Sequence, residues 1–209
     1  MIICCYTAIN NDWTPHQLAA NLARLPYAIT SDILEKTNQR DVQLAIGGKL
    51  LLMEALVQME MGADLSALQL DAYQRPFFDK DIDFNISHSG NMAICCVTTN
   101  GKIGVDIEQV QPIDFDDYQN YFNPNEWDEI LNAGDKTEAF FKFWTRKEAV
   151  LKAAGTGFYT PLLDIDVAAD HVDYAGNEYY LTRLNIVKGY QCYLAATVQQ
   201  GIEASQVML

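Results

Sequence analysis

Two acidic residues stand two positions apart in the segment GKIGVDIE, at Asp106 and Glu108. Apolar residues alternate with them, which predicts a strand that carries both carboxylates on one face. Carboxylates held side by side repel each other unless a cation or solvent lies between them. Oxygen ligands of this kind suit Mg²⁺, which proteins bind through few carboxylates together with water and substrate phosphates. The pattern also fits an ordinary exposed strand face, so both interpretations stay open.

A second candidate group lies on a helix expected over 138–154 and ended by Gly155. Glu148 lies at the edge of the apolar stripe of this helix, and Lys152 follows one turn later on the same side. One interpretation is an exposed Glu–Lys pair. The other makes Glu148 a third metal carboxylate and Lys152 a phosphate contact. Lys147 points into the apolar stripe, and we expect its long side chain to extend toward the same anion.

A third candidate is the segment FNISHSG, which contains Ser87 and His88. A strand is expected to stop here at a Ser-His-Ser-Gly turn, which would offer hydroxyls, backbone N–H groups and an imidazole to an anion. A nucleophilic serine with His88 as its base is disfavoured, because adjacent side chains rarely face each other and no G-x-S-x-G segment is present. A lone histidine is more often structural, so that interpretation stays open as well. Arg75 adds a cation just upstream, before a proline.

These residues must be positioned by short helices and strands. Strands are expected over 1–8, 68–73, 83–87, 92–98, 102–108, 162–168, 178–187 and 190–198. Helices are expected from Thr14-Pro15, over 38–60, from a capping box at 123–126 and over 138–154. Asn100-Gly101 predicts a hairpin between its flanking strands. Gly47-Gly48, inside the helix over 38–60, indicates the close approach of another backbone or a ligand.

The order of these elements, helices and then strands, occurs twice along the chain. It predicts an α+β fold of two similar lobes, each with helices packed on a small, mostly antiparallel sheet. We expect the boundary near residue 100, which gives an N-terminal lobe over 1–100 and a C-terminal lobe over 101–209. The metal-binding acids and the helix over 138–154 then belong to the second lobe.

Composition excludes several classes of protein. The 209 residues carry 14 Lys+Arg against 28 Asp+Glu, a net charge of −14, which argues against a broad nucleic-acid interface. No apolar run is long enough to cross a membrane, and the opening MIICCYTAI lacks the basic flank of a signal peptide. The 5 cysteines include no C-x-x-C pair and are expected to be reduced core thiols. We therefore expect a cytoplasmic globular protein.

The order and spacing of FNISHSG, GVDIE and FWTRKEAVLKAAGTG resemble the 4′-phosphopantetheinyl transferase superfamily. The chain length is similar to that of the long, surfactin-synthetase-activating (Sfp-like) type, a pseudo-dimer of two lobes. The resemblance implies transfer of the phosphopantetheine arm of coenzyme A to a serine hydroxyl of an apo acyl or peptidyl carrier protein. It also implies release of 3′,5′-ADP and dependence on Mg²⁺ or Mn²⁺. Such a chain is expected to act as a monomer, with its ligand cleft between the lobes.

The resemblance also implies roles for single residues, which fall into three groups. The metal acids would be Asp106, Glu108 and Glu148. The contacts to coenzyme A and its pyrophosphate would be Arg40, Arg75, Ser87, His88, Lys147 and Lys152. The catalytic groups would be Glu148, Lys152 and Glu126. Glu126 would be the base for the incoming serine, and its alternative role as the capping-box partner of Asn123 is equally compatible with the sequence.

Two features depart from the family pattern. Positions that are often basic around the glycine of the helix over 38–60 read Leu44 and Met53, for which Arg40 and Lys49 would substitute. The strong acidity requires a local apolar or basic patch for docking an acidic carrier, expected near 115–122. A metal-dependent phosphohydrolase acting on a nucleotide or coenzyme A-like ester is the alternative function. A non-catalytic interaction protein is a third, against which the intact acids and Lys152 count.

Overall fold

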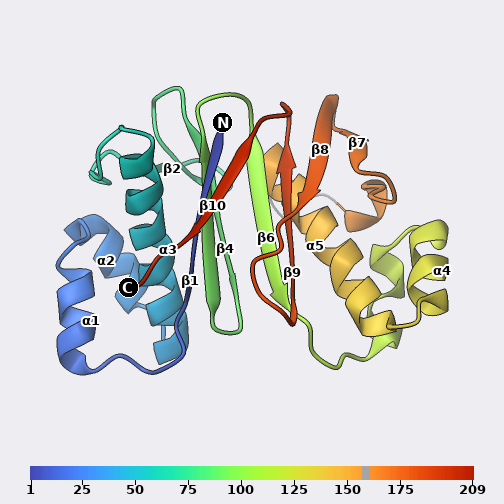
Figure 1. Ribbon diagram of the computed structural model, residues 1–209, viewed down its shortest axis with the longest axis horizontal. Helices are drawn as coiled ribbons and strands as arrows, with labels where there is room; N and C mark the ends of the chain where they lie inside the picture. The colour runs from blue at the N-terminus through green and yellow to red at the C-terminus, as the bar shows by residue number, and fades with distance from the viewer. Residues whose placement is uncertain (157–160) are drawn as a thin grey trace. The chain divides into compact units, whose positions relative to one another are not determined.

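The computed structural model describes residues 1–156 and 161–209. The chain forms two compact units, the first made of Met1–Asn100 with Gln200–Leu209 and the second of Gly101–Gln199. Each unit combines helices with a four-stranded sheet (Figure 1), and the predicted α+β class is confirmed. The segment 200–209 was expected in the C-terminal lobe. This segment belongs to the first unit, because the strand β10 (Ile202–Gln206) pairs with the first strand of the chain.

The sheet of the first unit has the strand order β10-β1-β5-β4. Its other strands are β1 (Ile2–Ala8), β4 (Asp83–Ser89) and β5 (Met92–Thr98). β5 is antiparallel to both β1 and β4, whereas β10 runs parallel to β1. A separate two-stranded ribbon joins β2 (Gln69–Leu70) to β3 (Pro76–Phe77), so the strand expected over 68–73 is only two residues long.

Three helices cover one face of this sheet: α1 (Pro15–Leu22), α2 (Tyr27–Leu34) and α3 (Gln39–Gln58) (Figure 1). α3 begins at Asn38, whose side chain accepts a hydrogen bond from the Arg40 amide. Gly48 lets this helix lie close to the sheet, because a Cβ there would be 2.7 Å from Cγ2 of Ile86. The close neighbour is therefore a side chain of the sheet, and not the backbone or ligand that the sequence indicated.

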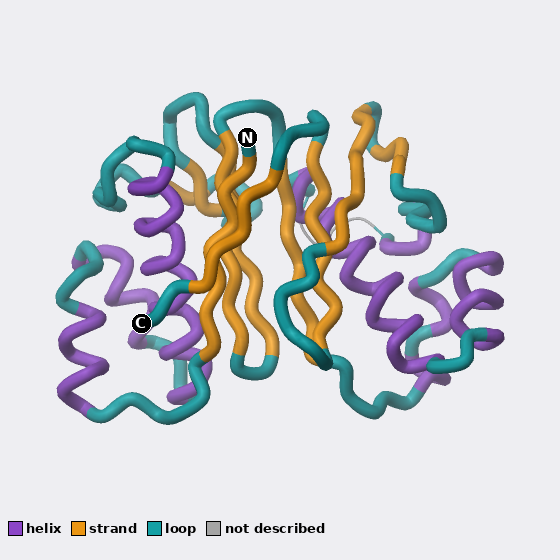
Figure 2. Tube along the Cα trace, in the orientation of Figure 1, coloured by secondary structure: helices purple, strands orange, loops and turns teal. Residues whose placement is uncertain are grey.

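The sheet of the second unit has the strand order β6-β9-β8-β7 and is antiparallel throughout. Its strands are β6 (Ile103–Gln109), β7 (His171–Tyr174), β8 (Asn177–Arg183) and β9 (Tyr190–Ala196). Two helices accompany it, α4 (Pro124–Asn132) and α5 (Lys136–Ala154), together with short 3₁₀ turns over Phe115–Asp117, Gln119–Tyr121 and Leu162–Asp164. Figure 2 shows these helices beside the strands of the same unit.

The predicted ends of α5 are confirmed. The Asp135 side chain accepts a hydrogen bond from the Glu138 amide at the start of the helix. Gly155 ends it in the left-handed conformation, with φ of 70°. The helix buries aromatic and aliphatic side chains against β6 and β9, which fixes the face that it turns toward the sheet.

Two predicted features are wrong. Asn100-Gly101 does not join a hairpin, because β5 and β6 lie in different sheets and β6 pairs with β9. Gly101 has a positive φ and lies where the chain leaves the first unit and enters the second. The amide of the next residue, Lys102, donates to Oγ1 of Thr197. The strand expected over 162–168 is a 3₁₀ turn followed by irregular chain. Its apolar residues Leu162, Ile165 and Val167 are buried in the core of the second unit without pairing as a strand.

Within the described ranges, no helix combines the length and the apolar character needed to cross a membrane.

Candidate active site

The strand β6 places Asp106 and Glu108 on the same face, as the alternation predicts. Asp106 lies opposite Tyr193 of β9 and is buried, with 2% of its surface exposed. Glu108 lies opposite Gln191, nearer the end of the strand, and is half-buried. The face is therefore not an ordinary exposed one. It is covered by α5, and solvent access increases toward Glu108.

Gly104 explains how closely α5 approaches this face. A Cβ on Gly104 would lie 2.2 Å from the Ala149 carbonyl oxygen and 2.3 Å from the Ala153 nitrogen. Both atoms belong to the helix backbone, so any larger residue would push α5 away from β6. Close contact brings the side of α5 that carries Glu148 and Lys152 against Asp106. The G-x-D-x-E pattern thus includes the glycine that allows the acids to meet the helix.

An ion pair joins the two elements. Nζ of Lys152 lies 2.5 Å from Oδ1 of Asp106, and the Lys152 side chain remains partly exposed. Glu148 is 6% exposed, and its Oε1 is buried without a hydrogen-bond partner among the described residues. A buried carboxylate oxygen that lacks a donor is costly unless a cation or water satisfies it. The interpretation of Glu148 and Lys152 as an exposed pair on the helix surface therefore does not hold. Glu148 is buried, and Lys152 pairs with Asp106.

The carboxyl group of Glu148 is strongly perturbed. Burial, and after it the neighbouring charge of Asp106, raise the pKa of Glu148 to about 7. Lys152 opposes this shift, while Glu108 adds to it. Three carboxylates thus influence one another at the β6–α5 contact, and one lysine compensates them only in part. Sites of this kind are typical of catalytic and metal centres.

The chemistry of these donor atoms suits a divalent cation. It offers hard oxygen atoms from Asp106, Glu108 and Glu148, including the Oε1 atom that lacks a donor. Mg²⁺ usually takes only a few protein carboxylates and fills its other positions with water and phosphate oxygens. The partial exposure of Glu108 and Lys152 leaves a side from which such ligands can enter.

Glu126 and Lys147 form a separate buried pair. Nζ of Lys147 lies 2.7 Å from Oε2 of Glu126, and both side chains are fully buried. Lys147 also donates to the carbonyl oxygens of Leu162 and Ile165. Its side chain therefore runs into the interior, and not toward an anion as expected from the sequence. Burial lowers the pKa of Lys147, and the hydrogen bond to Glu126 opposes that shift.

Glu126 serves as the capping-box partner at the start of α4. Its Oε2 accepts from the Asn123 amide, and its own amide donates to the Asn123 side chain. The other oxygen, Oε1, accepts from the Val167 amide at 2.9 Å. Both oxygens are thus occupied in the interior, where an incoming serine has no access. Of the two roles that the sequence left open, the structure exhibits the structural one.

The remaining candidates lie in the first unit, on and near β4. Ser87 and His88 are adjacent in this strand, so their side chains point to opposite faces, with Ser87 buried and His88 exposed. β4 continues through Ser89 and pairs with β5, so the backbone of His88 and Ser89 belongs to the sheet. The anion-binding turn expected at Ser-His-Ser-Gly is therefore a strand end, and the turn itself starts at Gly90.

The two arginines predicted to bind coenzyme A have partners within the same unit. Arg75 forms an ion pair with Asp83 at 2.9 Å. Arg40 donates to the Ile9 carbonyl oxygen and lies 3.4 Å from Asp12. Both guanidinium groups thus support the local chain.

A pocket of about 570 Å³ in the first unit contains two cations that the motifs did not single out as ligands. Lys36 and Lys49 line it together with His88, Pro76 and Asn85. Burial lowers the pKa of Lys49. The sequence indicates Lys49 only as a substitute for missing basic residues. No pattern indicates Lys36, because its position depends on how α2 folds against α3.

Comparisons with known proteins point to one family. Residues 102–196 match the family model described as the 4′-phosphopantetheinyl transferase superfamily. The chain is 34% identical over 128 residues to the 4′-phosphopantetheinyl transferase gsp of Aneurinibacillus migulanus, covering 60% of this chain and 54% of that protein. It is 29% identical over 149 residues to a 4′-phosphopantetheinyl transferase of Bacillus subtilis, covering 66% of each. A further relative is the 4′-phosphopantetheinyl transferase Sfp of Bacillus subtilis strain 168, 36% identical over 84 residues, which are 39% of this chain and 37% of that protein. The chain thus matches from about a third to two thirds of the length of these relatives.

Proposed function

Because residues 102–196 match the model of the 4′-phosphopantetheinyl transferase superfamily, we propose that the chain transfers 4′-phosphopantetheine from coenzyme A to a serine of an apo carrier protein. The transfer would release 3′,5′-ADP. The observation that carries the proposal is the β6–α5 contact. There Gly104 admits the helix backbone, and the buried Glu148 lies beside Asp106 and Lys152 within the region that matches the family.

We infer that Asp106, Glu108 and Glu148 hold Mg²⁺ at this contact. When bound, the cation would neutralise the pyrophosphate oxygens of coenzyme A and polarise the phosphorus that the serine attacks. Binding is supported by the raised pKa of Glu148, because burial and the charge of Asp106 both disfavour its ionised form, and a bound cation would offset both. Mn²⁺ has similar ligand preferences and is expected to replace Mg²⁺.

Lys152 is the residue that we propose to contact the transferred phosphate. Its ammonium lies against Asp106, and its side chain is partly exposed, so it can turn toward an anion on the open side. Positive charge placed there would stabilise the charge that develops on the phosphoryl oxygens. Glu126 and Lys147, enclosed in the interior, are proposed to hold α4, α5 and the segment 162–167 together.

For coenzyme A we propose contacts in the first unit with His88, Lys36 and Lys49. These three residues line the same pocket, which has a partly apolar wall formed by residues such as Ile29 and Leu68. Cationic side chains suit phosphate groups, and the apolar wall suits a nucleotide base. Ser87 and Arg75 would contribute indirectly, by stabilising β4 and the loop before β3.

The experiment incubates the chain with coenzyme A, Mg²⁺ and an apo carrier protein, and measures the mass of the carrier. A gain of one phosphopantetheine group is expected, and Asp106→Ala and Glu148→Ala should abolish it. Glu129→Ala, which removes an exposed acid of α4, is the matched control and should retain it. An unchanged carrier with every apo carrier of a fatty-acid, polyketide and peptide panel would contradict the proposal. Turnover of coenzyme A without a carrier would favour the phosphohydrolase instead.

A further inference from the structure

The hairpin β7–β8 has one face that the transfer proposal does not use. A two-residue turn, Ala175-Gly176, joins the strands, and both residues have positive φ, 51° and 76°. Turns of this kind match the twist of the strands and fix their register. On the inner face Val172 and Tyr179 are buried, which prevents the strands from slipping by one residue. The register therefore also fixes which side chains lie on the outer face.

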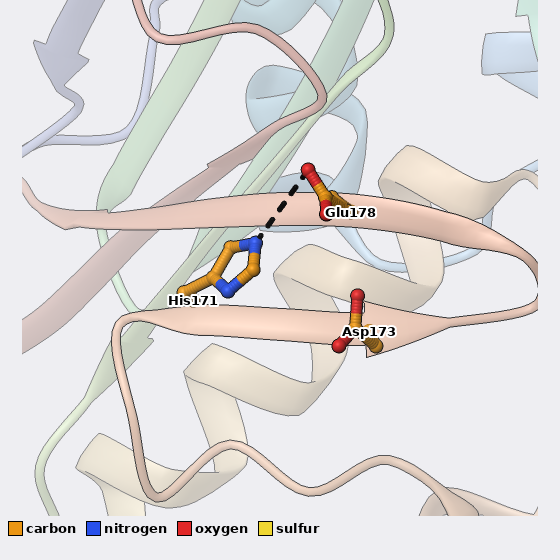
Figure 3. Close-up of side chains that lie close together, drawn as sticks. All are labelled: His171, Asp173 and Glu178. Carbon is orange, nitrogen blue, oxygen red and sulfur yellow. Dashed lines mark ion pairs between the residues drawn. The ribbon is translucent and has the colours of Figure 1, made fainter.

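Three side chains that can ligate a metal converge on this outer face. His171 and Asp173 lie two residues apart on β7, and Glu178 lies on β8 directly opposite Asp173. Each offers a nitrogen or oxygen atom, and these atoms all lie within 4.8 Å of one another. Figure 3 shows the imidazole of His171 and the two carboxylates gathered on the same side of the hairpin. Nε2 of His171 lies 3.8 Å from Oε2 of Glu178.

The two carboxylates on this face would be stabilised by a cation. Asp173 and Glu178 are cross-strand neighbours, and like charges in directly opposite positions destabilise a hairpin. One imidazole together with two carboxylates is a different donor set from the three carboxylates at the β6–α5 contact.

Tyr180 supports the orientation of the other groups. Its ring lies 5.1 Å from the imidazole of His171, centroid to centroid, and the two rings are tilted by 31°. Its hydroxyl lies 3.5 Å from Oε2 of Glu178. One side chain thus contacts two of the three ligands, as the outer-shell partners of metal sites commonly do.

We propose that His171, Asp173 and Glu178 form a second metal site, selective for a divalent transition-metal ion of which Zn²⁺ is the probe. Three protein ligands of nitrogen and oxygen type leave a fourth position for water in a tetrahedral zinc site. Mg²⁺ prefers oxygen ligands alone and would bind poorly at the imidazole. The inference goes beyond phosphopantetheine transfer and does not depend on it.

The test titrates the full chain with Zn²⁺ in a calorimeter, in the presence of excess Mg²⁺ to occupy the β6–α5 carboxylates. The five cysteines are all buried and do not compete in the folded protein. We expect one equivalent of Zn²⁺ to bind, and His171→Ala and Asp173→Asn to weaken it at least about tenfold. His16→Ala, which removes an exposed histidine of the first unit, is the control and should bind as the unaltered chain does.

Imidazole NMR signals give a second readout, because the chain has only 3 histidines. Zn²⁺ should shift the His171 signal at one equivalent and leave that of His16 unchanged. Equal Zn²⁺ affinity in the unaltered chain and in His171→Ala would overturn the proposal, as would equal losses in His171→Ala and His16→Ala. Carrier modification by His171→Ala in Mg²⁺ should be unchanged, and this separates the proposal from the function of the β6–α5 site.

Discussion

The buried pair of Lys147 and Glu126 gives a prediction whose size follows from its contacts. Lys147→Met keeps the length of the side chain and removes its charge. Glu126 would then remain in the interior with its two amide donors but without its cation. Removing one partner of a buried ion pair costs about 3–5 kcal/mol, and the Leu162 and Ile165 carbonyls would lose a donor as well. We therefore expect a loss of about 4 kcal/mol in the free energy of unfolding of the second unit.

Urea unfolding followed by tryptophan fluorescence measures this loss. Trp127 and Trp144 lie in the second unit, and a Trp13→Phe background removes the signal of the first. The double variant Lys147→Met with Glu126→Gln leaves no unpaired buried charge, so its loss should be smaller than the sum of the two single losses. A loss below about 1 kcal/mol for Lys147→Met, or additive losses in the double variant, would refute the reasoning.

Four further predictions concern other parts of the chain. The pKa of Glu148 is about 7 in the folded state against an ordinary 4.5, so the free energy of unfolding falls as the pH rises between these values. Glu148→Gln should therefore be more stable than the unaltered chain by up to about 3 kcal/mol at pH 8 and equally stable at pH 4, as measured by urea unfolding. At pH 8, Mg²⁺ should raise the Tm of the unaltered chain and leave that of Glu148→Gln unchanged in calorimetry. Gly104→Ala should destabilise the second unit by at least about 3 kcal/mol and abolish carrier modification, because its Cβ would meet the helix backbone at Ala149. Ala175→Gly relieves a positive φ of 51° and should stabilise the hairpin by about 1 kcal/mol, seen as a higher Tm.

Local patterns predicted on which element and face the proposed metal-binding acids lie, for identifiable reasons. The alternation in GVDIE placed Asp106 and Glu108 on one strand face, and the helical period placed Glu148 and Lys152 on one side of α5. Each inference depended on a single element. The contact between the two faces depends on tertiary packing, and Gly104 is the residue of the strand that makes room for it.

Predictions failed where a residue had two compatible partners. Asn100-Gly101 has the composition of a hairpin turn, but the choice between β5 and β9 as the neighbour of β6 is made by the whole second sheet. The side chain of Lys147 could extend to solvent or into the core. It lies in the core, because the carbonyl groups after α5 and the carboxylate of Glu126 accept its hydrogen bonds there. Such partners come from segments remote in sequence, so no local period reveals them.

The parallel pairing of β10 with β1 has a consequence for biosynthesis. β1 leaves the ribosome well before β10, and one of its two edges stays open until β10 follows. The whole second unit, Gly101–Gln199, is translated in between, which takes roughly 5–20 s at ordinary elongation rates. The later unit can thus finish folding before the earlier one, and throughout that interval the nascent chain carries an unprotected strand edge of the kind that chaperones shield from aggregation.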